Sequence, residues 1–172
     1  MDYFMLRQDP REIDSLTFIG ISHRELMGKL TSENPTALYV RSTETAEYMD
    51  YMERPAVFIS NPLYRMVKKY VPTLELGLAV FIDQTHGDQK LYWSLEDMEG
   101  SDCISGNSQL DKLGFITQLI LDETKIPEQP LFQVVHRQQR FTIVRLDLVE
   151  SLLRRGICGF HLQTVDTVRG EQ

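Results

Sequence analysis

The sequence predicts an α+β fold, with a mostly antiparallel sheet built from hairpins and three or four short helices packed on it. About seven or eight apolar or alternating segments are typical of strands, against three or four helical patterns. Two pairs of such segments flank short polar turns, at residues 84–87 and 136–140, which is the pattern of a β-hairpin. The prolines fall between periodic segments, where they would punctuate one compact domain.

The length of 172 residues is enough for one domain with a sizeable core. We expect a single domain over 1–172, in which residues 1–35 could form a loosely attached N-terminal segment. A hydrophobic content of 42% excludes disorder as the main state. The longest uncharged apolar runs, such as 76–82, are too short to span a bilayer, and residues 1–14 lack the pattern of a signal peptide.

The first predicted helix has a clear start. Ser22 can cap it, and Glu25, three residues on, completes a capping box for a helix that runs to Leu30. The other elements expected before residue 60 are strands over 16–19, 36–40 and 56–59 and a short helix over 44–52.

The next helix is predicted by its cap and its proline. Ser60 supplies the capping oxygen, and Pro62 is tolerated in the first turn because its missing N–H has no partner there. Apolar residues recur at helical spacing from Leu63 to Tyr70, and Pro72 stops the helix.

The C-terminal half reads mainly as strands. Asp147 is expected to cap one helix, and Gly156 to close it in the left-handed conformation. The expected strands cover residues 76–83, 89–95, 115–121, 131–135, 141–145 and 159–165, and the glycine-containing polar stretch 96–114 is expected to be irregular.

The charge balance bears on partners. The chain has 18 basic and 25 acidic residues, a net charge of −7, and no basic block. A nucleic-acid-binding protein would usually present a basic face, so we expect no nucleic-acid partner. A folded acidic protein favours a basic protein partner, or the charge serves solubility alone.

Residues able to do chemistry are few and scattered. The two cysteines, Cys103 and Cys158, suggest a reducing compartment, and we expect a cytoplasmic protein. The four histidines lack the spacing of metal ligands, and His86 is expected in a solvated turn. Nucleophile-elbow, dinucleotide and phosphate-loop motifs are absent. We therefore predict no catalytic residue, no metal and no cofactor, and a protein that is not an enzyme.

One acidic stretch stands out as a candidate partner-binding patch. Residues 83–102 hold six acids and one base, together with the only tryptophan. Acidic residues around an aromatic anchor are typical of a protein-binding surface, although a solvated loop with the aromatics in the core is an alternative. The candidate residues are Tyr92, Trp93, Glu96, Asp97, Glu99 and Asp102.

The order of segments carries a resemblance over residues 36–166. A strand ending in serine leads into a helix (55–72), followed by a hairpin (76–95), a polar stretch with Asp and Cys (96–114), and a strand–helix–glycine–strand ending (141–165). This order resembles the Imm11-like immunity proteins of bacterial polymorphic toxin systems. The resemblance implies a protein that binds and blocks a cognate toxin, with no catalytic motif and no toxin-contact residue to carry over.

Three functional hypotheses stay open at this stage. The first is a cytoplasmic immunity protein that neutralises its toxin by stoichiometric binding; the toxin could be basic, as many that attack nucleic acid are, and opposite charge would speed its capture. The second is a regulatory or structural interaction module of unrelated purpose. The third is a small hydrolase without a recognisable motif, which would need a concave pocket with perturbed carboxylates.

Overall fold

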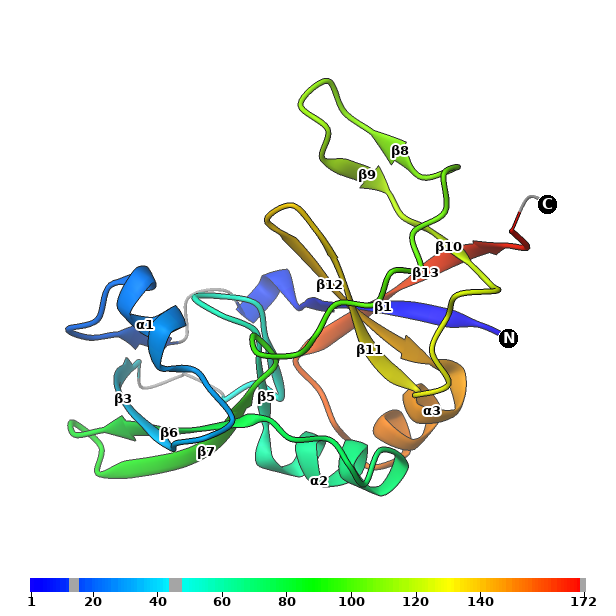
Figure 1. Ribbon diagram of the computed structural model, residues 1–172. Helices are drawn as coiled ribbons and strands as arrows, with labels where there is room; N and C mark the ends of the chain where they lie inside the picture. The colour runs from blue at the N-terminus through cyan, green and yellow to red at the C-terminus, as the bar shows by residue number, and fades with distance from the viewer. Residues whose placement is uncertain (13–15, 44–47, 171–172) are drawn as a thin grey trace. The chain divides into compact units, whose positions relative to one another are not determined.

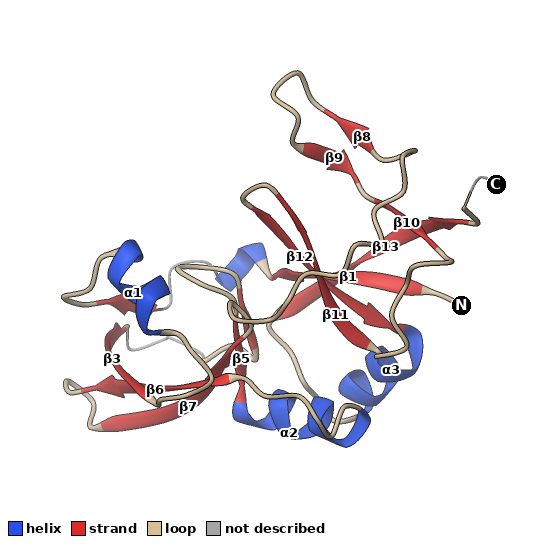
Figure 2. Cartoon of the chain, viewed as in Figure 1, coloured by secondary structure: helices blue, strands red, loops and turns tan. Residues whose placement is uncertain are grey.

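The structure is a computed structural model that describes residues 1–12, 16–43 and 48–170. Figures 1 and 2 show an α+β protein in which strands outnumber helices, as the sequence predicts. The chain divides into two compact units, and the single-domain assignment stays a prediction. The first unit comprises Met1–Leu6, Glu99–Ser151 and Leu162–Gln172, and the second comprises Arg7–Met98 and Leu152–His161.

A five-stranded sheet in the order β10-β13-β1-β12-β11 dominates the first unit. Strands β11 and β12 form the predicted hairpin, β1 pairs antiparallel with β12, and β10 pairs parallel with β13. A separate two-stranded ribbon, β8–β9, extends away from this sheet (Figure 1). The bounds are β1 Tyr3–Gln8, β8 Gln109–Leu110, β9 Ile116–Gln118, β10 Ile120–Asp122, β11 Leu131–His136, β12 Gln139–Arg145, α3 Leu146–Arg154 and β13 Phe160–Val168.

The second unit is built on a six-stranded sheet in the order β2-β3-β6-β7-β5-β4. Strands β6 and β7 form the other predicted hairpin, whereas β3 runs parallel to β6. Both large sheets therefore contain a parallel pair, and neither is purely antiparallel. The bounds are η1 Pro10–Glu12, β2 Leu16–Phe18, α1 His23–Lys29, β3 Thr36–Ser42, β4 Tyr51–Met52, β5 Phe58–Ser60, α2 Asn61–Tyr70, β6 Gly77–Asp83 and β7 Asp88–Ser94.

Both predicted helix starts are confirmed. The Ser22 hydroxyl accepts a hydrogen bond from the Glu25 N–H while the Glu25 carboxylate accepts from the Ser22 N–H, which is the expected capping box. At α2, the Ser60 hydroxyl accepts from the Leu63 N–H at 3.3 Å, and Pro62 lies in the first turn. Gly156 follows α3 with φ +69°, as expected of a left-handed residue after a helix.

Three expectations about individual elements are wrong. A helix was predicted over 44–52, but Tyr51 and Met52 form a short strand that pairs with β5. Residues 44–47 of this predicted helix lie outside the described part of the chain. The predicted strand over 115–121 is two strands, because β9 pairs with β8 and β10 with β13. Helix α3 begins at Leu146, so Asp147 does not cap it; the Asp147 carboxylate instead accepts two hydrogen bonds from Arg145.

The N-terminal segment 1–35 contributes β1 to one sheet and β2 to the other. Strand β1 was not predicted, because Tyr3–Gln8 mixes apolar and polar residues without regular alternation.

Aromatic rings fill the core of the second unit. Phe81 stacks on Tyr92 at 4.3 Å between ring centroids, and the rings of Phe18 and Phe58 each meet it edge-on at 5.1 Å. Leu26 and Leu30 of the α1 segment belong to the same buried cluster. One face of β3, β6 and β7 therefore packs into the core, except near the turn, where Asp88 and Lys90 of β7 are exposed.

Candidate functional site

The two aromatic residues of the predicted patch lie on opposite faces of the sheet. Tyr92 is buried in the core, and its hydroxyl donates to the Met49 carbonyl at 2.7 Å. Trp93 is half-buried on the other face, where its ring stacks on Tyr64 of α2 at 3.9 Å and its Nε1–H donates to Asn61. Tyr92 therefore has a core role, while Trp93 borders an accessible surface.

The four acidic residues of the patch are divided between the units. In the second unit, Glu96 accepts from the Val57 N–H at 2.8 Å, and Asp97 accepts from the Ser32 N–H at 3.3 Å. Both carboxylates thus fix loop backbone. Glu99 and Asp102 are exposed and belong to the first unit. The six residues do not form one cluster in either unit, and their role in partner binding stays a prediction.

The cysteines lie in different units, and neither Cys103 nor Cys158 forms a disulfide. Cys103 is fully buried in the core of the first unit although it lies in the polar stretch 96–114, and burial raises its thiol pKa to about 11. A thiol with this pKa is un-ionised at neutral pH and a poor nucleophile. Cys158, which follows α3 in the sequence, is exposed.

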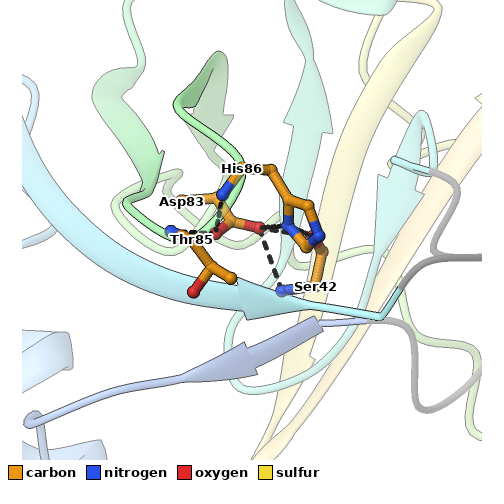
Figure 3. Close-up of polar contacts among 4 residues, drawn as sticks. All are labelled: Ser42, Asp83, Thr85 and His86. Atoms are coloured by element: carbon orange, nitrogen blue, oxygen red, sulfur yellow. Dashed lines mark hydrogen bonds and ion pairs between the residues drawn. The ribbon is translucent and has the colours of Figure 1, made fainter.

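A serine, an aspartate and a histidine meet at the end of the β6–β7 hairpin (Figure 3). The Asp83 carboxylate is inaccessible to solvent and accepts hydrogen bonds from the Ser42 hydroxyl and the Ser42 N–H. The His86 Nδ1 lies 2.9 Å from Asp83 Oδ2 and 3.0 Å from Ser42 Oγ. No local sequence pattern indicates this contact, because Ser42 lies in a strand 41 residues before Asp83.

Backbone N–H groups of the turn after β6 also donate to the Asp83 carboxylate. Asp83 Oδ1 accepts from the N–H of Thr85 at 2.9 Å and of His86 at 3.3 Å, as in an Asx turn. Hydrogen bonds from Ser42, then from His86, hold the pKa of Asp83 far below its ordinary value. The carboxylate is therefore ionised throughout the neutral range.

These three residues do not have the geometry of a serine-hydrolase triad. A triad uses both imidazole nitrogens, one held by the carboxylate and the other accepting the serine proton. Here Asp83 and Ser42 both face the same nitrogen, Nδ1 of His86, and Ser42 Oγ donates directly to the carboxylate. The cluster therefore stabilises the hairpin and gives no activated nucleophile.

A groove of about 850 Å³ opens elsewhere in the second unit. Its apolar part includes Phe18, Met49 and Met52, and its polar part includes His23 and His161. The carboxylates with strongly lowered pKa do not line it: Asp83 lies at the hairpin, and Asp9, with a pKa of about 2, is hydrogen-bonded by Arg11. The hydrolase hypothesis required a pocket and perturbed carboxylates together, and this groove does not bring Asp9 or Asp83 into its lining.

Metal ligation has no candidate in the described part of the chain. Within residues 1–12, 16–43 and 48–170, no three His, Cys, Asp or Glu side chains gather closely enough to hold an ion. Across the same residues, no helix is long and apolar enough to cross a membrane.

The face of β3, β6 and β7 opposite the core is apolar, and we call it the outer sheet face. Its rows follow from the strand register: Val80 lies opposite Leu91 and beside Ala37, and Ile82 lies beside Tyr39. Tyr39 is 47% and Leu91 44% exposed. The apolar residues of the outer sheet face are Ala37, Tyr39, Leu78, Val80, Ile82, Leu91 and Trp93, and two polar residues, Arg41 and Gln89, lie on it at the end away from Trp93.

Among the described residues, Tyr64 and Ile59 mark one end of the outer sheet face as covered. Tyr64 of α2 lies on Trp93, and Ile59, the β5 neighbour of Trp93, is fully buried. Away from this end, the row of Ala37, Val80 and Leu91 is accessible to varying degrees. Neighbouring apolar side chains of this kind, in contrast to scattered single residues, make this face a candidate interaction surface.

The sequence of strand β6 is the feature that indicates this surface. Its segment Gly77–Ile82 is apolar at every position, which is typical of a strand covered on both faces. Every second residue, including Ala79 and Phe81, is buried in the core, whereas Leu78, Val80 and Ile82 are only half-buried. Strand β6 therefore has the composition of a strand that is buried on both faces, but only one of its faces is buried.

No protein-family model matches this chain, and no curated protein matches it either.

Proposed function

We propose that the protein is a cytoplasmic immunity protein that binds and neutralises a cognate bacterial toxin by stoichiometric protein–protein interaction, with the outer sheet face as its docking surface. It is proposed to act without catalysis and without a cofactor. The toxin is proposed to be basic overall, complementary to the net charge of −7 on this chain.

The observation that carries this proposal is the half-covered strand β6. Leu78, Val80 and Ile82 face outward beside Leu91 and Tyr39, without a second layer over most of the surface. A protein partner would provide that layer, and removing these side chains from water would favour the complex by roughly 25 cal/mol per Å² of apolar area. The choice of a toxin as the partner rests on the resemblance of residues 36–166 to immunity proteins.

The direct experiment uses the gene next to this one. We expect it to encode a large secreted protein whose C-terminal domain forms a one-to-one complex with the full chain, seen by size-exclusion chromatography with light scattering. Absence of any such complex, in a locus of metabolic genes, would contradict the immunity function. A one-to-one complex with a harmless neighbour would instead support an interaction module of unrelated purpose, since the same surface would serve it.

The acidic residues give a kinetic prediction. Neutralising Glu96, Asp97, Glu99 and Asp102 together would also disturb the loops that Glu96 and Asp97 fix. The cleaner variant is Glu99→Gln with Asp102→Asn, because both side chains are exposed. We expect it to slow association with a basic toxin several-fold at low salt and negligibly at 0.5 M salt, where the screening length is only about 4 Å.

Stopped-flow association at two salt concentrations measures this effect. Asp166→Asn serves as a control, because it removes another exposed acid of the first unit. An unchanged rate at low salt would exclude the acidic patch and leave the outer sheet face as the docking surface.

A further inference from the structure

The ribbon β8–β9 of the first unit ends in an apolar tip that reaches away from the five-stranded sheet (Figure 1). Leu113, in the turn between the two strands, is 71% exposed, and Leu110 is 53% exposed. Lys112 lies between them in the sequence and is exposed as well. Two accessible leucines on one protruding turn are unusual, because an isolated turn is normally polar.

The turn holds its own shape. Asp111 Oδ1 accepts from the N–H of Leu113 at 2.8 Å and of Phe115 at 2.9 Å. The Asp111 N–H donates to the Phe115 carbonyl at 2.9 Å, and the Gly114 N–H donates to the Asp111 carbonyl at 3.0 Å. Four hydrogen bonds on Asp111 thus fix the backbone on both sides of Leu113.

A second turn, between β11 and β12, braces the first. The Arg137 guanidinium donates to the Leu113 carbonyl at 2.5 Å, and the Gln139 side-chain amide bonds to both the N–H and the carbonyl of Ile116. The contact with Arg137 is so close that a Cβ on Gly114 would lie 2.5 Å from the guanidinium, and Gly114 also has φ +79°. The tip is therefore held rigid before it meets any partner.

We infer that this tip is a second docking element for the toxin, in which Leu110 and Leu113 enter an apolar pocket whose rim carries carboxylates. This inference rests on the proposed function. Rigid apolar anchors bind well because little conformational freedom is lost on association. The acidic rim follows from charge complementarity, because the exposed cations Lys112 and Arg137 lie beside Leu113, while the one neighbouring carboxylate, Asp111, accepts hydrogen bonds from the backbone of the turn.

The test compares affinities for the toxin domain by titration calorimetry. Leu110→Ser with Leu113→Ser keeps the Asp111 and Arg137 hydrogen bonds, which involve backbone atoms, and should reduce the affinity by roughly tenfold or more. Lys112→Glu should weaken binding at low salt, with the difference shrinking as salt is added. Leu153→Ser is the matched control, because Leu153 is 55% exposed and lies outside the ribbon.

The outcomes separate this inference from the proposed function. If the double variant binds like the wild type while variants of the outer sheet face lose binding, the tip is not a docking element and the proposed function stands. If the wild-type protein itself does not bind the toxin domain, both fail. Arg137→Ala retains both leucines and removes the brace, so a smaller loss of affinity there would support the role of rigidity.

Discussion

Replacing Tyr39 and Leu91 together by threonine is expected to weaken the complex with the toxin by about 100-fold or more. Central interface side chains contribute on the order of 2 kcal/mol each when truncated, and each 1.4 kcal/mol is a factor of ten in Kd. Threonine retains the preference for strand, and both side chains point away from the core, so the fold should persist. Titration calorimetry of the purified pair measures the change.

Leu153→Thr is the control for this variant, because it also removes an exposed leucine in the second unit without touching the outer sheet face. Thermal unfolding of all three proteins establishes that they are folded. A double variant that binds within a factor of three of the wild type would contradict docking on this face.

Asp83→Asn is expected to be among the most destabilising single polar substitutions in the second unit. The carboxylate accepts from two groups of Ser42 and from two N–H groups of the following turn, and an amide cannot accept at both positions. We expect Tm at pH 7 to fall by on the order of 5–10 °C.

The effect of Asp83→Asn on Tm is expected to depend on pH. Since hydrogen bonding holds the pKa of folded Asp83 far below its ordinary value of 3.8, the folded state retains a charge that the unfolded chain loses first. The stabilisation is complete above about pH 4 and is lost progressively as the pH falls below it. The difference in Tm between wild type and Asp83→Asn should therefore be largest near neutral pH and narrow below pH 4.

Thermal unfolding at intervals from pH 7 to pH 2.5 tests this dependence. Glu33→Gln is the control, since Glu33 is an exposed acid and its replacement should leave Tm nearly unchanged at every pH. A gap between wild type and Asp83→Asn that stays constant down to pH 2.5 would show that the charge of Asp83 does not stabilise the fold.

Local signals predicted the parts of this fold that depend on neighbouring residues. Ser22 and Ser60 mark the starts of α1 and α2 because a capping hydroxyl bonds within three residues of itself. The hairpins β6–β7 and β11–β12 followed from alternation around a short turn.

Features that depend on distant partners were not predicted. Tyr51 and Met52 read as the end of a helix, and only pairing with β5 makes them a strand. Ser42 meets Asp83 and His86 across 41 and 44 residues, which no local pattern encodes. Tyr92 could have been assigned either to a binding surface or to the core, because the alternation of residues in a strand does not say which of its two faces is buried.

The outer sheet face is a further feature that the sequence alone does not determine. The apolar run in β6 is typical of a strand that is covered on both faces, but one sequence does not say whether the second cover belongs to the same chain. The structure provides a core on one face and leaves Tyr39 and Leu91 accessible on the other.

A growth assay tests the central claim most directly. The toxin domain from the adjacent gene is expressed in a sensitive bacterial host together with the wild-type chain, the Tyr39→Thr, Leu91→Thr variant or the Leu153→Thr control, at matched protein levels. Docking through the outer sheet face predicts that the wild type and the control restore growth and that the double variant does not. Equal protection by all three proteins would contradict it.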